Sequence, residues 1–345
     1  MRIVLDAMGS DTCPGPEIQA SVEAARIFGD EIILVGPAKE LEQHLHTLTG
    51  DGAVPLVRIV PAPDIITMQD KGLKLALKAK RKGSQTSMAI GMDLVKGGQA
   101  DCFVTAGNTG GALATAYYRL GTIPGVERPA LTALFPVAGG YCVVTDIGAN
   151  PDCKPIHLLQ FAIMGSVYAE KVRRIENPRL GLLSNGEEAG KGNELVKGTF
   201  PLLEASGLNF IGNVEGKELF GGQADVVVTD GFTGNILLKS SEAVAKLITD
   251  ILRQELTSSL RTKAGGLLAK PAFGEIKKLL DPAEVGAAPL LGIDGLVFVG
   301  HGRSEARALV NAIRTARQAV QADLLGALRS AIQVRLADVG TTETV

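Results

Sequence analysis

Tryptophan is absent from this chain of 345 residues, and aromatic residues make up only 4% of it. Proteins that bind single-stranded nucleic acid stack the bases on aromatic side chains, so this composition argues against such a role. The formal net charge is −2, so no overall positive field attracts nucleic acid. We therefore predict no nucleic-acid partner.

Cysteine is also scarce. No two cysteines have the C-x-x-C spacing, and two of the four lie in apolar, strand-like runs: Cys13, Cys102, Cys142 and Cys153. A disulfide framework or a metal site is therefore not expected, and a reducing cytoplasm fits. The chain opens on a strand-like run, so no signal peptide is expected. The longest uncharged run, 129–145, is too short and too interrupted by proline and glycine to span a bilayer.

Several signatures of cofactors and catalysis are missing. The chain lacks the G-x-G-x-x-G and G-x-x-x-x-G-K-[ST] patterns of nucleotide-binding loops, so no nucleotide cofactor is predicted. It also lacks the G-x-S-x-G and H-E-x-x-H patterns of hydrolases. We expect catalysis by positioning and charge stabilisation, without a covalent acyl-enzyme.

Glycine, in contrast, is abundant at 42 residues, and 46% of the chain is hydrophobic. Short apolar runs alternate with helical segments, which predicts a three-layer α/β/α fold with a mostly parallel sheet. No linker divides the chain, so we predict one domain, 1–345, with a helical excursion at 244–280 that breaks at Gly265–Gly266. The expected strands are 2–5, 32–35, 56–60, 102–105, 131–135, 142–146, 180–183, 209–211, 226–229 and 296–299.

Two segments are nearly the same. Segments 97–110 and 221–234 match at ten of fourteen positions, and each has an apolar run, a glycine turn and a helix start. The amide groups at the start of a helix lack intrahelical partners and, with the helix dipole, bind anions. We expect the two turns to lie side by side in one sheet and to form a cleft for a phosphate-bearing or carbonyl-bearing ligand.

Ligands of parallel sheets bind at the carboxyl ends of the strands, which selects candidate residues after each apolar run. Asp6 follows the first run, although turn or cap chemistry is the commoner role of such an aspartate. The first glycine turn offers Gly107, Asn108, Thr109 and Gly110 to phosphate oxygens, against the alternative of a plain α/β turn.

A second group of candidates follows the middle strands. Asn150 ends a strand, and Lys154 stands before a helix, where a cation opposes the helix dipole unless it serves an anion. Lys191 and Asn193 lie in a polar, glycine-rich loop that is expected to form a rim of the cleft.

The repeated turn and the last strand supply the remaining candidates. His301 lies between two glycines after a strand, which favours an active-site role about as strongly as a structural one. The candidates in this group are Asp230, Phe232, Thr233, Gly234, Asn235, His301 and Ser304.

A basic stretch, 71–92, contains no acidic residue. Its cations are Lys71, Lys74, Lys78, Lys80, Arg81 and Lys82. The usual interpretation of such a run is a solvated helix face, and the alternative is a surface that receives an acidic macromolecule or an anion.

Together these segments resemble the PlsX family of phosphate acyltransferases of bacterial phospholipid synthesis. The motifs, in order, are D-A-M-G-S-D, T-A-G-N-T-G-G, G-A-N-P-D-C-K-P, A-I-M-G-S-V-Y, K-G-N, F-I-G-N-V-E, D-V-V-V-T-D-G-F-T-G-N and H-G-x-S. They cover the chain from Ile3 to the final helix. Single motifs are generic, but the ordered set is specific.

The resemblance implies the transfer of a fatty acyl group from acyl carrier protein to inorganic phosphate, giving acyl phosphate for a downstream glycerol-3-phosphate acyltransferase. It also implies a fold related to phosphotransacetylases and isocitrate-dehydrogenase-like enzymes, a homodimer, no metal and peripheral membrane attachment. Segment 256–280 is expected to contact the membrane or the dimer partner. We assign phosphate binding to Asn108 and Lys154, thioester positioning to Asp230 and assistance to His301.

Three alternatives remain open. The first is a phosphotransacetylase acting on acyl-CoA. The second is a dehydrogenase of the related fold, although no nucleotide-binding signature supports it. The third is a catalytically silent membrane scaffold for enzymes of lipid synthesis.

Overall fold

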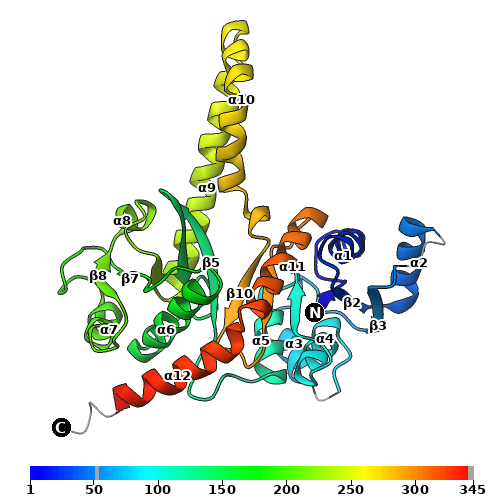
Figure 1. The fold of residues 1–345 in the computed structure, drawn as a ribbon, viewed down its shortest axis with the longest axis horizontal. Helices are drawn as coiled ribbons and strands as arrows, with labels where there is room; N and C mark the ends of the chain where they lie inside the picture. Colours follow the sequence, from blue (N-terminus) through cyan, green and yellow to red (C-terminus); the bar gives the residue numbers. More distant parts are fainter. Residues whose placement is uncertain (51–53, 82, 341–345) are drawn as a thin grey trace.

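The computed structural model describes residues 1–50, 54–81 and 83–340, so Lys82 of the basic stretch lies outside the described residues. The described strands join in one sheet of eleven, in the order β3-β2-β1-β4-β11-β10-β5-β6-β9-β7-β8 (Figure 1). Their bounds are β1 Arg2–Asp6, β2 Glu31–Gly36, β3 Val57–Pro61, β4 Cys102–Thr105, β5 Ala130–Val137, β6 Gly140–Thr145, β7 Leu180–Leu183, β8 Phe210–Val214, β9 Val226–Val228, β10 Ala287–Leu291 and β11 Val297–Gly300.

Each of the ten expected strands is present; two have the expected bounds, 102–105 and 180–183, and the bounds of the others differ by one to three residues. The sequence prediction missed β10, whose central Pro289 lacks the N–H that a strand residue donates. Pro289 pairs with Phe298 of β11 in an antiparallel ladder. This extra strand decides the directions of its neighbours.

The strand directions divide the sheet into two parallel blocks that run in opposite senses. β3, β2, β1, β4 and β11 are mutually parallel, and so are β6, β9, β7 and β8. β10 pairs antiparallel with β11 and β5, and β5 pairs antiparallel with β6. The carboxyl ends of β1, β4 and β11 therefore lie on the same side of the sheet. This side, which is defined by strand ends and not by an outermost strand, is here called the β4 edge. Those of β6, β7 and β9 lie at the opposite edge, called the β9 edge.

Helices cover both faces of the sheet, which confirms the three-layer α/β/α fold. Ile3 and Leu5 of β1 face one apolar cluster, and Val4 between them faces the other, as the alternation of a strand requires. The helices are α1 Gly15–Phe28, α2 Ala38–Thr49, α3 Gly72–Lys80, α4 Ser87–Lys96, α5 Thr109–Arg119, α6 Pro155–Lys171, α7 Glu194–Glu204, α8 Gly216–Phe220, α9 Gly231–Leu256, α10 Leu260–Leu280, α11 Ala306–Gln321 and α12 Leu324–Gly340, with a 3₁₀ turn η1 at Pro282–Glu284.

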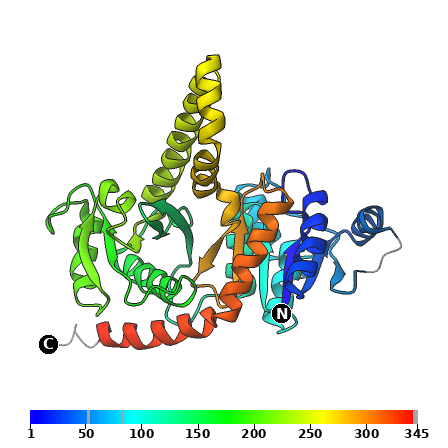
Figure 2. The same cartoon turned by 45° about the horizontal axis from the view of Figure 1, so that its top comes forward.

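The helical excursion is a hairpin of α9 and α10 that projects away from the rest of the molecule (Figures 1 and 2). The expected break at Gly265–Gly266 is wrong, because both glycines lie inside α10. The chain turns instead at 257–259, where the Ser259 hydroxyl accepts a hydrogen bond from the Thr262 N–H and starts a new helix. A Cβ added at Gly266 would lie 3.5 Å from Leu256, an ordinary van der Waals contact, so α10 packs against the end of α9 at this position.

The helical segment after Ser304 is divided into α11 and α12. Asp323 between them has φ of +48°, a left-handed conformation that a continuous helix does not contain. α11 packs on α1, and α12 packs on α6 at the other end of the sheet (Figure 2). The carboxyl-terminal segment therefore connects the two parallel blocks.

Candidate active site

Three loops meet at the β4 edge. The loop after β1 joins the loop after β11 through a hydrogen bond from the Asp11 N–H to the Gly302 carbonyl oxygen, at 2.7 Å. It also lies against the loop after β4, because a side chain at Gly9 would come within 2.9 Å of the Ala106 and Gly107 nitrogens. The fold thus brings together seven of the predicted site residues: Asp6, Gly107, Asn108, Thr109, Gly110, His301 and Ser304.

The buried side chain of Asp6 holds the turn after β4 in place through hydrogen bonds. Its buried carboxylate accepts hydrogen bonds from the Thr105 hydroxyl at 2.8 Å and from the Met8 N–H at 3.2 Å. Thr105 in turn accepts a hydrogen bond from the Gly107 N–H at 2.9 Å. Burial raises the pKa of Asp6 above its ordinary value, against the opposing effect of its hydrogen bonds. Asp6 is therefore placed to position the turn and does not reach the surface.

Asn108 shapes the head of α5 with its whole side chain. Its Oδ1 accepts a hydrogen bond from the Gly111 N–H at 3.0 Å, and its Nδ2 donates to the carbonyl oxygens of Thr67 and Asp70 at 3.1 and 3.0 Å. Both Nδ2 hydrogens are thus committed to the protein. The amides of Thr109 and Gly110 remain in the exposed first turn of the helix, where no intrahelical carbonyl reaches them.

His301 is exposed at the same edge. Its Nδ1 accepts a hydrogen bond from the Arg303 N–H at 3.3 Å, so the neutral ring carries its proton on Nε2. Ser304 is buried beneath it and donates its backbone N–H to the His301 carbonyl oxygen at 2.9 Å. The arrangement presents an N–H donor to a ligand at this edge.

Two buried carboxylates near these loops were missed by the sequence prediction. Glu17 of α1 accepts a hydrogen bond from the Ser10 N–H at 2.8 Å, and burial raises its pKa to about 7. Asp70, whose side chain is fully buried, lies 2.6 Å from Lys78 Nζ and 2.9 Å from Lys74 Nζ. These lysines hold the pKa of Asp70 well below its ordinary value. Nothing in the local sequence distinguishes either residue from a solvated helix or loop acid.

The repeated turn lies at the β9 edge. Asp230 caps α9 by accepting hydrogen bonds from the Thr233 N–H at 2.9 Å and the Thr233 hydroxyl at 2.8 Å. The Gly231 N–H donates to the Asn150 carbonyl oxygen at 2.8 Å, and Asn235 lies beside Gly148. A side chain at Gly234 would overlap the Asp146 carbonyl oxygen, so only glycine fits there. Phe232 is exposed.

Asp146 is the centre of the β9 edge, and the sequence prediction also missed it. Its buried carboxylate accepts hydrogen bonds from the backbone amides of Leu131, Gly148, Ala149 and Asn150 and from Asn150 Nδ2. Asn150 Nδ2 also donates to the Pro129 carbonyl oxygen at 2.7 Å. Burial raises the pKa of Asp146, and these bonds oppose the rise. Asn150 is therefore committed to the turn, as Asn108 is at the other edge.

Lys154 precedes α6 as expected, with its side chain exposed and Pro155 at the first helical position. Its backbone N–H donates to Nδ1 of His157, whose Nε2 lies 2.9 Å from Glu127. α6 follows β6, so Lys154 belongs to the β9 edge. The predicted pairing of Lys154 with the Asn108 turn is therefore wrong for a single chain.

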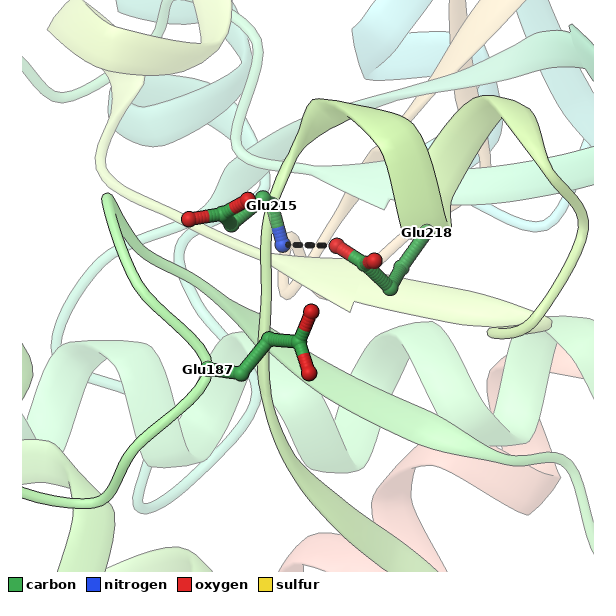
Figure 3. Close-up of side chains that lie close together, drawn as sticks. All are labelled: Glu187, Glu215 and Glu218. Atoms are coloured by element: carbon green, nitrogen blue, oxygen red, sulfur yellow. Dashed lines mark hydrogen bonds between the residues drawn. The ribbon is translucent and has the colours of Figure 1, made fainter.

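The loop after β7 also lies at the β9 edge. Asn193 caps α7 through the Val196 N–H at 3.0 Å, and Lys191 is exposed. Three neighbouring glutamates, Glu187, Glu215 and Glu218, bring carboxylate oxygens close together (Figure 3). Lys217 Nζ already lies 2.7, 3.6 and 3.4 Å from them, in that order, so one ammonium group offsets part of the negative charge of this cluster.

The expectation that the two glycine turns lie side by side is wrong. β4 and β9 are separated by four strands, which corresponds to about 24 Å along the sheet. They also run in opposite directions, so their carboxyl ends lie at opposite edges. The candidate active site is therefore the β4 edge, where three loops and the exposed amides of α5 converge.

Comparisons with known proteins agree with the motifs. A family model described as "Fatty acid synthesis protein" matches residues 1–326. Phosphate acyltransferase of Acidobacterium capsulatum is 46% identical over 92% of this chain and 92% of its own. Phosphate acyltransferase of Pelotomaculum thermopropionicum is 44% identical over 96% and 95%.

Solved structures show the same fold. A phosphotransacetylase from Streptococcus pyogenes superposes with a TM-score of 0.59 at 20% identity, covering 93% of this chain and 94% of that one. The EutD phosphotransacetylase from Staphylococcus aureus gives a TM-score of 0.58 at 16% identity with the same coverage. The fold is thus the phosphotransacetylase-like one that the motifs imply. Since its sequence relatives extend over nearly the whole chain, the protein belongs to the PlsX family of phosphate acyltransferases and is an enzyme of acyl transfer to phosphate.

Proposed function

We propose that the enzyme transfers a fatty acyl group from the thioester of an acyl carrier protein to inorganic phosphate, and that the acyl phosphate feeds phospholipid synthesis. The proposal rests on the structure of the first turn of α5. There Thr109 and Gly110 are exposed residues whose amides have no intrahelical partner, while Asn108 holds their turn in place through three hydrogen bonds. A dianion is the ligand that such a helix start favours.

The chemistry requires no covalent enzyme intermediate. A phosphate oxygen attacks the thioester carbon, a C–O bond forms, the C–S bond breaks, and the thiolate leaves with the carrier and takes up a proton. Holding the two reactants in line contributes up to about 7–11 kcal/mol in favourable cases. His301 donates its Nε2 hydrogen to the thioester oxygen as negative charge develops there.

Three site residues at the β9 edge have no part in this mechanism. Lys154, Asp230 and Asn150 shape turns at the edge opposite the phosphate amides. Sequence alone assigned Lys154 to phosphate and Asp230 to the thioester. Within one chain both residues lie at the edge opposite Asn108, so this proposal gives them no role. The roles predicted for Lys191, Asn193 and Phe232 stay predictions.

A purified-enzyme assay tests the function. Acyl phosphate is measured with an acyl carrier protein thioester and with the matching acyl-CoA, each with phosphate omitted as the control. Faster turnover of the carrier thioester supports the proposal, whereas a preference for acyl-CoA identifies a phosphotransacetylase of the kind the fold resembles. Absence of product from both thioesters contradicts either activity.

The hairpin of α9 and α10 supports two further parts of the proposal, a homodimer and peripheral attachment at the cytoplasmic face of the membrane. Its α9 carries an exposed apolar stripe of Val244, Leu247, Ile248, Ile251 and Leu252. Farther along the hairpin, Leu260, Leu267 and Leu268 are 86%, 71% and 85% exposed. We assign the stripe to a second copy and 256–280 to a lipid surface. Among the described residues, no helix is long and apolar enough to cross a membrane.

Liposome flotation separates the two roles of the hairpin. A Leu267→Glu, Leu268→Glu variant is expected to remain dimeric on a sizing column and to lose flotation with anionic vesicles. Loss of the dimer instead would assign the tip to subunit contact. Flotation equal to that of the unchanged protein would contradict the membrane assignment.

A further inference from the structure

The outer face of α3 combines exposed leucines with cations. Leu73 and Leu77, one helical turn apart, are 76% and 61% exposed, and Lys74 between them is 72% exposed. Lys71 and Lys80 are also exposed. We call these five residues the α3 face. No acidic residue occurs from 71 to 92, and Lys74 pairs with Asp70 just before this stretch, so Lys71 and Lys80 carry most of the positive charge that the face presents to a partner.

A tyrosine of α5, which packs against α3, extends the α3 face. Lys80 Nζ lies 5.8 Å from the centre of the Tyr118 ring, which is itself 46% exposed on α5. The result is an apolar strip with a basic rim and an aromatic side chain at one end. Interfaces between proteins concentrate their binding energy in such apolar centres, while the charged rim steers the partner and sets its orientation.

The α3 face is fixed to the phosphate turn. Asn108 Nδ2 holds the carbonyl oxygens of Thr67 and Asp70, the segment from which α3 starts. The Asp70 carboxylate itself forms ion pairs with Lys74 and Lys78 of α3. On the inner face of the helix, Leu75 lies close enough to Gly110 and Gly111 to contact a side chain placed there. A partner seated on α3 is thus held at a constant position relative to the amides of α5.

We propose that the α3 face is the docking surface of the acyl carrier protein, with Leu73 and Leu77 as its apolar centre. The inference rests on the proposed function, since it names where the acyl donor of that reaction binds. The partner must present acidic residues around an apolar patch, and it must deliver a thioester to the β4 edge. A second copy of this chain is the weaker candidate, because α9 offers it a longer apolar stripe, beside which Lys239 and Lys246 are paired with Glu242 and Asp250.

The test compares two thioesters and two variants. The Leu73→Ser, Leu77→Ser variant removes the apolar centre, and the Val334→Ser variant, 58% exposed on α12, is the matched control. Each is assayed with the acyl group on carrier protein and with the same acyl group on free pantetheine, which lacks the protein partner. We expect the α3 variant to lose about tenfold in kcat/KM with the carrier and to keep its rate with acyl-pantetheine. The control should keep both rates.

Each other outcome overturns the inference in a distinguishable way. Equal carrier rates for the α3 variant and the control would show that the leucines do not receive the carrier, while the proposed function stands. Loss of both rates would assign the leucines to the phosphate turn. A change of molecular mass in the variant would assign the face to a second copy. If the unchanged protein forms no acyl phosphate from either thioester, the proposed function itself fails.

Discussion

Replacing Asn108 by alanine tests the central assignment, because this side chain connects three parts of the site. The variant loses the N-cap bond to Gly111, worth about 1 kcal/mol. It also loses two bonds to the carbonyls of Thr67 and Asp70, each worth about 1 kcal/mol. We expect the free energy of unfolding to fall by about 3 kcal/mol. For a chain of 345 residues that corresponds to a Tm lower by about 4 °C.

The same change should act on phosphate binding more than on the acyl donor. Without the side chain, the turn that presents the Thr109 and Gly110 amides is no longer held, so the apparent KM for phosphate should rise about tenfold or more. The KM for the carrier thioester should change less. Both constants come from initial rates of acyl-phosphate formation, and stability comes from urea unfolding of the same preparations.

The repeated turn supplies the matched control. Asp230→Ala removes an equivalent N-cap, the bonds from the Thr233 N–H and hydroxyl, and should cost about 1–2 kcal/mol of stability. Because this turn lies at the opposite edge of the sheet, the phosphate KM of that variant should stay within about twofold of the unchanged protein. An unchanged phosphate KM in the Asn108 variant, or an equal rise in both variants, would refute the placement of phosphate at α5.

Three further predictions follow from individual contacts. Burial raises the pKa of Glu17 to about 7 from 4.5, so the folded protein retains a proton that the unfolded chain releases. The contribution of Glu17 to the free energy of unfolding should be full below about pH 4.5 and decrease by at most about 3 kcal/mol as the pH rises to 7. Glu17→Gln should flatten this part of the urea-unfolding profile, and an unchanged profile would contradict the shift. Raising the salt from 50 to 500 mM should increase the KM for the carrier thioester and leave that for acyl-pantetheine nearly unchanged, since the α3 face is exposed and basic; equal effects on both would argue against charge steering. Gly234→Ala should lower the yield and the thermal stability of the folded protein, because the added methyl group overlaps the Asp146 carbonyl oxygen. Gly265→Ala is the control and should be tolerated, because the space beside Gly265 in α10 is open. Equal thermal stability of the two variants would show that the β9 edge can adjust.

Local sequence patterns were sufficient for the secondary elements. Ten strands were predicted from apolar runs of three to five residues, because the tendency of such a run to form a strand depends mainly on its own composition. β10 escaped because Pro289 interrupts the pattern, and its place in the ladder depends on β11 and β5. The hairpin turn was misplaced for a similar reason: Ser259 capping outweighed two glycines that α10 tolerates.

The sequence by itself determined the family, the three-layer fold and the nature of each glycine turn, since the order of the motifs and the residues that begin each helix are local properties of the sequence. Only the tertiary structure decided which turns share a site. One antiparallel insertion, β10 with β5, reverses the second half of the sheet and sends the Asp230 turn to the edge opposite Asn108. The direction in which a strand enters a sheet depends on pairing between segments far apart in the chain, and no local pattern records it.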